Sequence, residues 1–200
     1  MLTQIPYNRQ FAVAYARKWA LSRNPIFPDF TGIGGNCTNF ISQCLLAGSS
    51  VMDFTPTFGW YFRSLDDRSP SWSGVEQLFD FLTGNGDFEQ LEAQGPFAMV
   101  ASSREQIEIG DVVQLARPSG DFYHTLMISE ITDDDILVCA NSDNALDRPL
   151  STYNYASARI LHVMGVALEV PYAECVTPLY NGEQVRTLQV GSIRIIPPEE

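Results

Sequence analysis

The apolar residues of this chain change their spacing near residue 107, from a helical period to a strand period. Ahead of that point, Phe11, Tyr15 and Trp19 recur every four residues and predict an amphipathic helix over residues 8–22. Beyond it, the apolar residues gather in short β-rich runs, which predict strands at residues 112–115, 125–131, 136–140 and 160–168. Helices followed by a mainly antiparallel sheet predict an α+β fold.

Two more helices are predicted in the first half of the chain. The second begins at Cys37 and ends at Gly48, with its apolar residues three and four positions apart. The third begins with a capping box formed by Ser73 and Glu76, and it ends in the turn-forming residues 83–86.

A cysteine stands where a glycine-rich loop enters the second predicted helix. Gly34 and Gly35 allow a tight turn and a close approach of substrate. Asn36 is a favoured N-cap residue, which makes Cys37 the first helical residue. The N-terminus of a helix carries partial positive charge and therefore favours the reactive thiolate. Cys37 is a candidate nucleophile, although a small core residue would show the same local pattern.

The other cysteines do not suggest a metal or redox site. Cys44, Cys139 and Cys175 lack the Cys-x-x-Cys spacing of zinc ribbons and thioredoxin-like sites. Each lies in an apolar run, and each is expected to be buried in the core.

A nucleophilic cysteine needs a base, and His124 is placed to supply one. His124 precedes the predicted strand 125–131, and Asn141 follows the predicted strand 136–140. A short turn between antiparallel strands brings these two residues to one end of a hairpin. Asn141 would orient the imidazole, with Asp143 as the alternative.

The second histidine of the chain has a simpler explanation. His162 lies inside a predicted strand, where a hydrogen-bonded structural histidine is the usual case. His124 is therefore the predicted base. The order Cys37, His124, Asn141 is that of papain-like enzymes.

The sequence resembles a known family, the putative amidase domain family, which is a branch of the papain-like fold related to CHAP-type and other cell-wall peptide hydrolases. The resemblance covers residues 7–168 and is carried by the segments 7–9, 14–16, 35–44, 60–61, 71–75, 110–114, 124–125 and 141–150. The family usually has aspartate where this chain has Asn36, and it often has histidine where this chain has Asn141. The resemblance implies a papain-like domain over residues 1–170, with residues 171–200 as a C-terminal extension packing on it.

This resemblance implies a cysteine-dependent hydrolase of an amide or peptide bond, with a cell-wall stem peptide as the family's substrate class. The Cys37 thiolate would attack the carbonyl, His124 would move the proton, and Asn141 would orient His124. The oxyanion would be held by the Cys37 N–H and one side-chain donor, for which Asn36 and Tyr7 are candidates. No cofactor or metal is implied. An acyltransferase with the same dyad and a catalytically inactive peptide-binding module are the alternatives.

Aromatic residues gather between the second and third predicted helices. Most are expected in the core. Trp60 and Trp72 are candidate walls of a substrate groove beside Cys37, because loops next to a nucleophile commonly hold the substrate.

Charge and hydropathy exclude several partner classes. A net charge of −12 argues against nucleic acid and against an anionic membrane surface as partner. No run approaches the roughly 20 apolar residues that cross a bilayer. No signal peptide is visible at the N-terminus, which favours the cytoplasm unless the chain is a mature or truncated form. The oligomeric state is not indicated.

Overall fold

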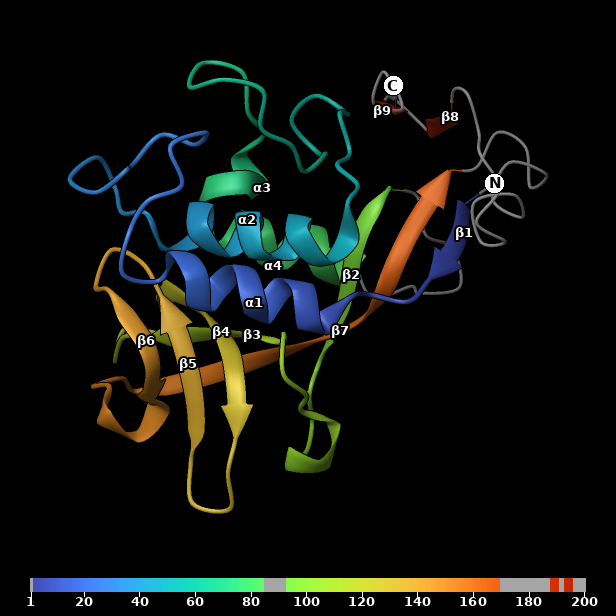
Figure 1. Ribbon diagram of the computed structural model, residues 1–200. Helices are drawn as coiled ribbons and strands as arrows, with labels where there is room; N and C mark the ends of the chain where they lie inside the picture. The colour runs from blue at the N-terminus through green and yellow to red at the C-terminus, as the bar shows by residue number, and fades with distance from the viewer. Residues whose placement is uncertain (1, 85–92, 170–187, 191–192, 196–200) are drawn as a thin grey trace.

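One curved sheet of seven strands, with helices on one of its faces, makes up most of the described part of the molecule (Figure 1). The computed structural model describes residues 2–84, 93–169, 188–190 and 193–195. The helices are α1 (Arg9–Trp19), α2 (Cys37–Ser49), α3 (Pro70–Ser73) and α4 (Val75–Thr83), with short 3-10 turns η2 (Arg104–Gln106) and η3 (Leu150–Thr152). The strands of the sheet are β1 (Leu2–Ile5), β2 (Gly95–Val100), β3 (Val112–Ala116), β4 (Phe122–Ile131), β5 (Ile136–Ala140), β6 (Ala145–Pro149) and β7 (Ser157–Glu169).

The sheet is antiparallel throughout and runs in the order β1-β7-β3-β4-β5-β6, with β2 also paired to β7. The long strand β7 joins its two halves, pairing with β3 through its first residues and with β1 and β2 through its last. The predicted α+β class is confirmed, and the four predicted strands correspond to β3, β4, β5 and β7.

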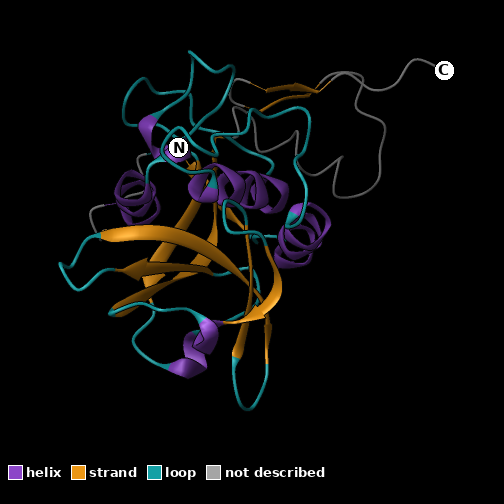
Figure 2. Ribbon diagram, turned by 90° about the vertical axis from the view of Figure 1, so that its left-hand side faces the viewer, coloured by secondary structure: helices purple, strands orange, loops and turns teal. Residues whose placement is uncertain are grey.

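Each face of the sheet covers its own hydrophobic core, because successive residues of a strand point to opposite faces. The first core joins the helices to one face and includes Phe40 and Leu45 of α2 with Met127 of β4. The second core lies on the other face and includes Leu126 and Ile128 of β4. Figure 2 shows α1, α2 and α4 on the same side of the sheet.

The buried face of α1 is shifted from the one that its aromatic spacing suggests. Ala12, Val13 and Ala16 are buried. Tyr15 and Trp19 pack partly buried against the first core, as predicted, whereas Phe11 is 64% exposed. Small alanine side chains let α1 lie close against α2, so packing distance decided which face turned inward.

The start of α4 also differs from its prediction. Ser73 ends the short helix α3, and Gly74 is the N-cap residue of α4, without a side-chain cap. A capping box from Ser73 to Glu76 is therefore absent, because the chain makes two consecutive helices there.

In the C-terminal segment, the short strands β8 (Leu188–Val190) and β9 (Ile193–Ile195) pair with each other. The rest of the extension, including Cys175, lies outside the described residues. None of the described helices is long and apolar enough to span a bilayer.

Candidate functional site

Cys37 is the first residue of α2, as the sequence predicts. Its side chain is 7% exposed, and its thiol is free. The preceding Gly34 and Gly35 have φ angles of +108° and +102°, which side-chain-bearing residues rarely adopt. The glycine-rich loop therefore has a conformational reason for its composition, and it delivers the thiol to the helix N-terminus.

Asn36 fastens this helix start to the end of β5. Its Nδ2 donates to Asn141 Oδ1 over 2.7 Å, and its backbone N–H donates to the Ser142 hydroxyl. Its Oδ1 accepts from Phe30 N at 3.1 Å and from Asn39 Nδ2 at 2.8 Å. Asn36 is the N-cap residue of α2, as predicted, but its side chain makes no capping bond. The side chain instead bridges segments, which corrects the prediction of a free oxyanion donor.

On the other side of Cys37, Thr38 fastens α2 to β4. The hydroxyl oxygens of Thr38 and Thr125 are 3.0 Å apart and both side chains are fully buried. Thr125 follows His124 directly. The backbone of Cys37 is thus held between the segment that starts at Asn141 and the strand that carries His124.

The imidazole of His124 lies on the face of the sheet opposite to Thr125. Its ring is near those of Tyr123 and Tyr153, with centroids 6.1 Å from each. His124 is 8% exposed, and its Nε2 is buried without a hydrogen-bond partner. Burial lowers the pKa of His124 to about 4, while Asp143 acts to raise it and Arg148 to lower it. The imidazole is therefore neutral at pH 7.

An open pocket of about 420 Å³ lies against this histidine. Its walls include Tyr123, His124, Ser142, Asp143, Arg148 and Tyr153. This volume is within the usual range of small-molecule sites.

Cys37 and His124 do not share a hydrogen bond in this structure. The Cys37 sulfur is 3.8 Å from the Thr38 hydroxyl oxygen, and no hydrogen bond among the described residues involves the imidazole of His124. The fold therefore brings the predicted nucleophile and base to the same end of the sheet, with the base turned toward the pocket.

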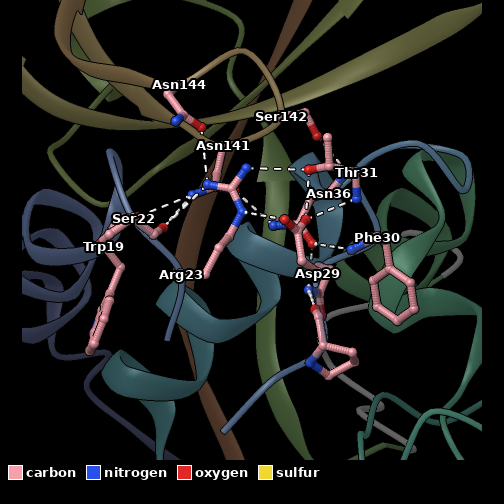
Figure 3. Close-up of polar contacts among 12 residues, drawn as sticks. Trp19, Ser22, Arg23, Asp29, Phe30, Thr31, Asn36, Asn141, Ser142 and Asn144 are labelled. Atoms are coloured by element: carbon pink, nitrogen blue, oxygen red, sulfur yellow. Dashed lines mark hydrogen bonds and ion pairs between the residues drawn. The ribbon is translucent and has the colours of Figure 1, made fainter. Parts of the chain in front are cut away.

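Asn141 makes no hydrogen bond to the imidazole of His124 and instead joins three segments (Figure 3). Its Nδ2 donates to the carbonyls of Trp19, at 3.0 Å, and Ser22, at 2.9 Å, beyond the end of α1. Its Oδ1 accepts from Asn36. Asn141 is 1% exposed, so the side chain is committed to these bonds. The sequence placed Asn141 at the correct end of the hairpin, but the structure gives it a different partner from the predicted one.

Arg23 strengthens the same junction from the surface. It forms an ion pair with Asp29 at 3.1 Å and donates to Asn144 Oδ1 at 3.0 Å and to Thr31 Oγ1 at 3.2 Å. Figure 3 shows the guanidinium between the loop before α2 and the segment after β5. No signal in the sequence points to Arg23 at this junction, because its partner Asn144 lies 121 positions away in the chain.

Tyr7 is wrongly predicted as an oxyanion donor. Its hydroxyl donates to the Gly110 carbonyl at 3.4 Å, and the Asn8 N–H donates to the Gly48 carbonyl near the C-terminal end of α2. Eleven residues of helix, roughly 16 Å, separate that position from Cys37.

Trp60 and Trp72 are also wrongly predicted, because neither lines a groove. Both side chains are 0% exposed, and their ring centroids are 5.1 Å apart in the first core. Trp60 donates to Ser42 Oγ at 3.0 Å, and Trp72 donates to Asn39 Oδ1 at 2.8 Å. The two tryptophans support α2 from within.

His162 is a structural residue, as predicted. Its Nδ1 is 2.9 Å from Asp111 Oδ2, and Asp111 Oδ1 accepts from Arg9 at 2.6 Å and from Val163 N at 3.0 Å. Asp111, which directly precedes β3, is 0% exposed, and these hydrogen bonds explain how a charged residue is accommodated there.

Cys44 and Cys139 are fully buried, as predicted. In the described ranges, no group of three His, Cys, Asp or Glu side chains could hold a metal ion.

Comparison with known proteins agrees with the predicted family. The family model described as putative amidase domain matches residues 6–164. YhbB, an uncharacterised protein of Bacillus subtilis strain 168, is 34% identical over 125 residues, which are 61% of this chain and 37% of that protein. The chain thus spans little more than a third of the length of this relative. No solved structure matches the chain significantly. The family model contains most of the length of the chain, including Cys37, at the start of α2, and His124, in β4. The chain therefore belongs to the putative amidase domain family.

Proposed function

We propose that this protein is a cysteine-dependent hydrolase of an amide or peptide bond, with Cys37 as the nucleophile and His124 as the base. The supporting observation is the pair of attachments around Cys37. Asn36 is bonded to Asn141 and Thr38 is bonded to Thr125, so the thiol is held beside the strand end that carries His124. Membership of a family named for amidase activity supports the same reaction class.

The protonation state of His124 suits a general base. Burial lowers its pKa to about 4, so its neutral form can accept the Cys37 proton at pH 7. Catalytic hydrogen bonds are often long without substrate and shorten when substrate binds. In the structure described here no hydrogen bond holds the imidazole, so turning it toward Cys37 breaks no polar contact.

The reaction would proceed through a thioester. As the Cys37 sulfur attacks the carbonyl carbon, its proton passes to His124, and the carbonyl oxygen becomes an oxyanion near the first N–H groups of α2, which have no intrahelical acceptor. His124 then protonates the leaving amine as the carbon–nitrogen bond breaks. Water, deprotonated by His124, cleaves the thioester and restores the thiol. Asn141 acts by positioning Asn36 and hence Cys37.

Turnover of peptidyl amides tests this proposal. Cell-wall stem peptides, the substrate class that the resemblance implies, and peptidyl aminomethylcoumarins are suitable first substrates. Cys37→Ala should abolish amine release, whereas Cys44→Ala, assayed below its melting temperature, should retain it. Hydrolysis that persists in Cys37→Ala would exclude the proposed nucleophile. Adding primary amines to the assay would separate hydrolysis from acyl transfer.

A structure with a peptide aldehyde bound to Cys37 tests the base directly. We expect the aldehyde carbon bonded to the Cys37 sulfur and the imidazole of His124 turned toward that sulfur or toward the new hydroxyl. An adduct in which His124 keeps its present orientation would contradict its role as base.

A further inference from the structure

The wall of the pocket beside His124 contains polar atoms that have no hydrogen-bond partner among the described residues. Tyr153 Oη is buried without a partner, as is Nε2 of His124, which is 92% buried as a residue. Buried polar atoms normally have partners, so unpartnered atoms in the wall of an open pocket suggest that a ligand supplies them. Burial raises the pKa of Tyr153 to about 12, so its hydroxyl keeps its proton at neutral pH.

Arg148 brings a positive charge to the same pocket. Its Nε donates to Thr152 Oγ1 at 2.9 Å, one terminal nitrogen donates to Asp143 at 3.2 Å, and the other donates to the Thr152 carbonyl at 3.2 Å. These bonds use three of the five N–H groups of a guanidinium and leave one on each terminal nitrogen. The guanidinium also lies 4.0 Å from the centroid of the Tyr153 ring. Arg148 is therefore held in place and still has two N–H groups that could bind a ligand.

The remaining polar groups of the pocket support the same interpretation. The Ser142 hydroxyl accepts from the Asn36 N–H, so its own proton remains available to a ligand. Asp143 is the acidic group among the lining residues, and its side chain is 74% exposed and paired with Arg148. Neighbouring donors on a guanidinium match the two oxygens of a carboxylate.

We propose that this pocket is the subsite for a carboxylate on the amide substrate, bound by Arg148 and Tyr153 on the side of His124 away from the helices. This inference rests on the proposed function, because the bound carboxylate would be the substrate group next to the bond that Cys37 would cleave. The substrate class is an acidic peptide amide.

Binding to the Cys37→Ala variant tests the subsite without turnover. The probes are the α-amides of N-acetylglutamate and N-acetylglutamine, in L and D forms, which differ in one carboxylate against one carboxamide. NMR signals of the His124 imidazole report binding in the pocket. We expect the glutamate probe, in at least one configuration, to bind about tenfold more tightly, because hydrogen bonds to a charged group are roughly twice as strong as neutral ones.

Two arginine variants of Cys37→Ala separate the pocket from general charge. Arg148→Gln should remove the preference for glutamate, whereas Arg117→Gln should keep it. Arg117 carries the same charge and lies over the Tyr123 ring, 4.4 Å from its centroid, but it is not among the residues that line the pocket. Tyr153→Phe should reduce the preference several-fold and tests the site even if Arg148→Gln folds poorly.

Any of three results would overturn the subsite: equal affinity for the two probes, a preference that survives Arg148→Gln, or unchanged His124 signals at saturating probe.

The subsite and the proposed function can fail independently of each other. Loss of the subsite with Cys37-dependent turnover intact removes only the carboxylate assignment. A carboxylate preference in binding without Cys37-dependent turnover removes the hydrolase and leaves the pocket as a binding site.

Discussion

Asn36 Nδ2 donates a buried 2.7 Å hydrogen bond to Asn141 Oδ1, which ties the residue before the candidate nucleophile to the end of β5. The two residues are 105 positions apart in the chain. The resemblance to the family leads us to expect aspartate at the position of Asn36 and histidine at the position of Asn141. A carboxamide supplies both a donor and an acceptor, so a pair of asparagines can bond directly here.

Asn141→Ala should weaken catalysis without ending it. The variant leaves the buried amide of Asn36 without its acceptor, which costs about 1–3 kcal/mol of stability. The carbonyls of Trp19 and Ser22 each lose one donor but keep the bonds from Ser22 N and from Arg23. Misplacement of Cys37 should lower kcat by on the order of 10²-fold. Chemical denaturation and steady-state kinetics measure the two effects.

Two variants serve as controls for that experiment. Asn144→Ala removes an exposed amide from the same segment and should change both quantities little. Asn141→His, the commoner family residue, should retain more activity than Asn141→Ala. Full activity in Asn141→Ala would show that Asn36 does not position the nucleophile.

Cys37 should react with iodoacetamide faster than Cys44 or Cys139. Cys37 begins a helix and is 7% exposed, whereas Cys44 and Cys139 are 0% exposed. Burial also raises the pKa of both core thiols, which lowers their thiolate population. Mass spectrometry over a time course at neutral pH gives the three rates. Slower labelling at Cys37 would argue against an accessible nucleophile.

His124 should titrate near pH 4 in an NMR experiment, because burial disfavours its charged form. The chain contains two histidines, so the spectra of wild type and His162→Gln assign the signal. His124→Ala should abolish turnover, whereas His162→Gln should retain turnover with some loss of thermal stability. The opposite result would identify His162 as the base.

The same pKa predicts an acid-dependent loss of stability. Between pH 6.5 and about 4, the unfolded chain binds a proton at His124 that the folded chain does not. The stabilisation is therefore complete above pH 6.5 and is lost as the pH falls to about 4, by about 3 kcal/mol in total. Denaturant unfolding across this range should show a smaller loss in His124→Gln. Identical pH profiles would mean that the imidazole is solvated.

Asp111→Ala should destabilise the fold by about 3–5 kcal/mol, because it leaves the cation of Arg9 without its buried partner. Asp143→Asn is the matched control, since that carboxylate is exposed and its ion pair contributes about 1 kcal/mol or less. Urea unfolding measures both. Equal stability of Asp111→Ala and wild type would show that Glu108 and the backbone carbonyls suffice to hold Arg9.

Local signals in the sequence determined the order of helices and strands and the position of Cys37. Periodicity, glycines and turn residues act over a few positions, so they can be read without a partner segment. The hairpin also placed His124 and Asn141 at one end of the sheet, because antiparallel pairing and a short turn fix that geometry.

The tertiary structure decided what each side chain contacts. Trp60 and Trp72 lie in the core and donate hydrogen bonds to residues of α2. Asn141 bonds to Asn36 instead of the imidazole, and the guanidinium of Arg148 lies over the ring of Tyr153 at the pocket. These outcomes depend on segments brought together from distant parts of the chain. The free energy of burying a side chain depends on its neighbours, and local sequence does not specify them.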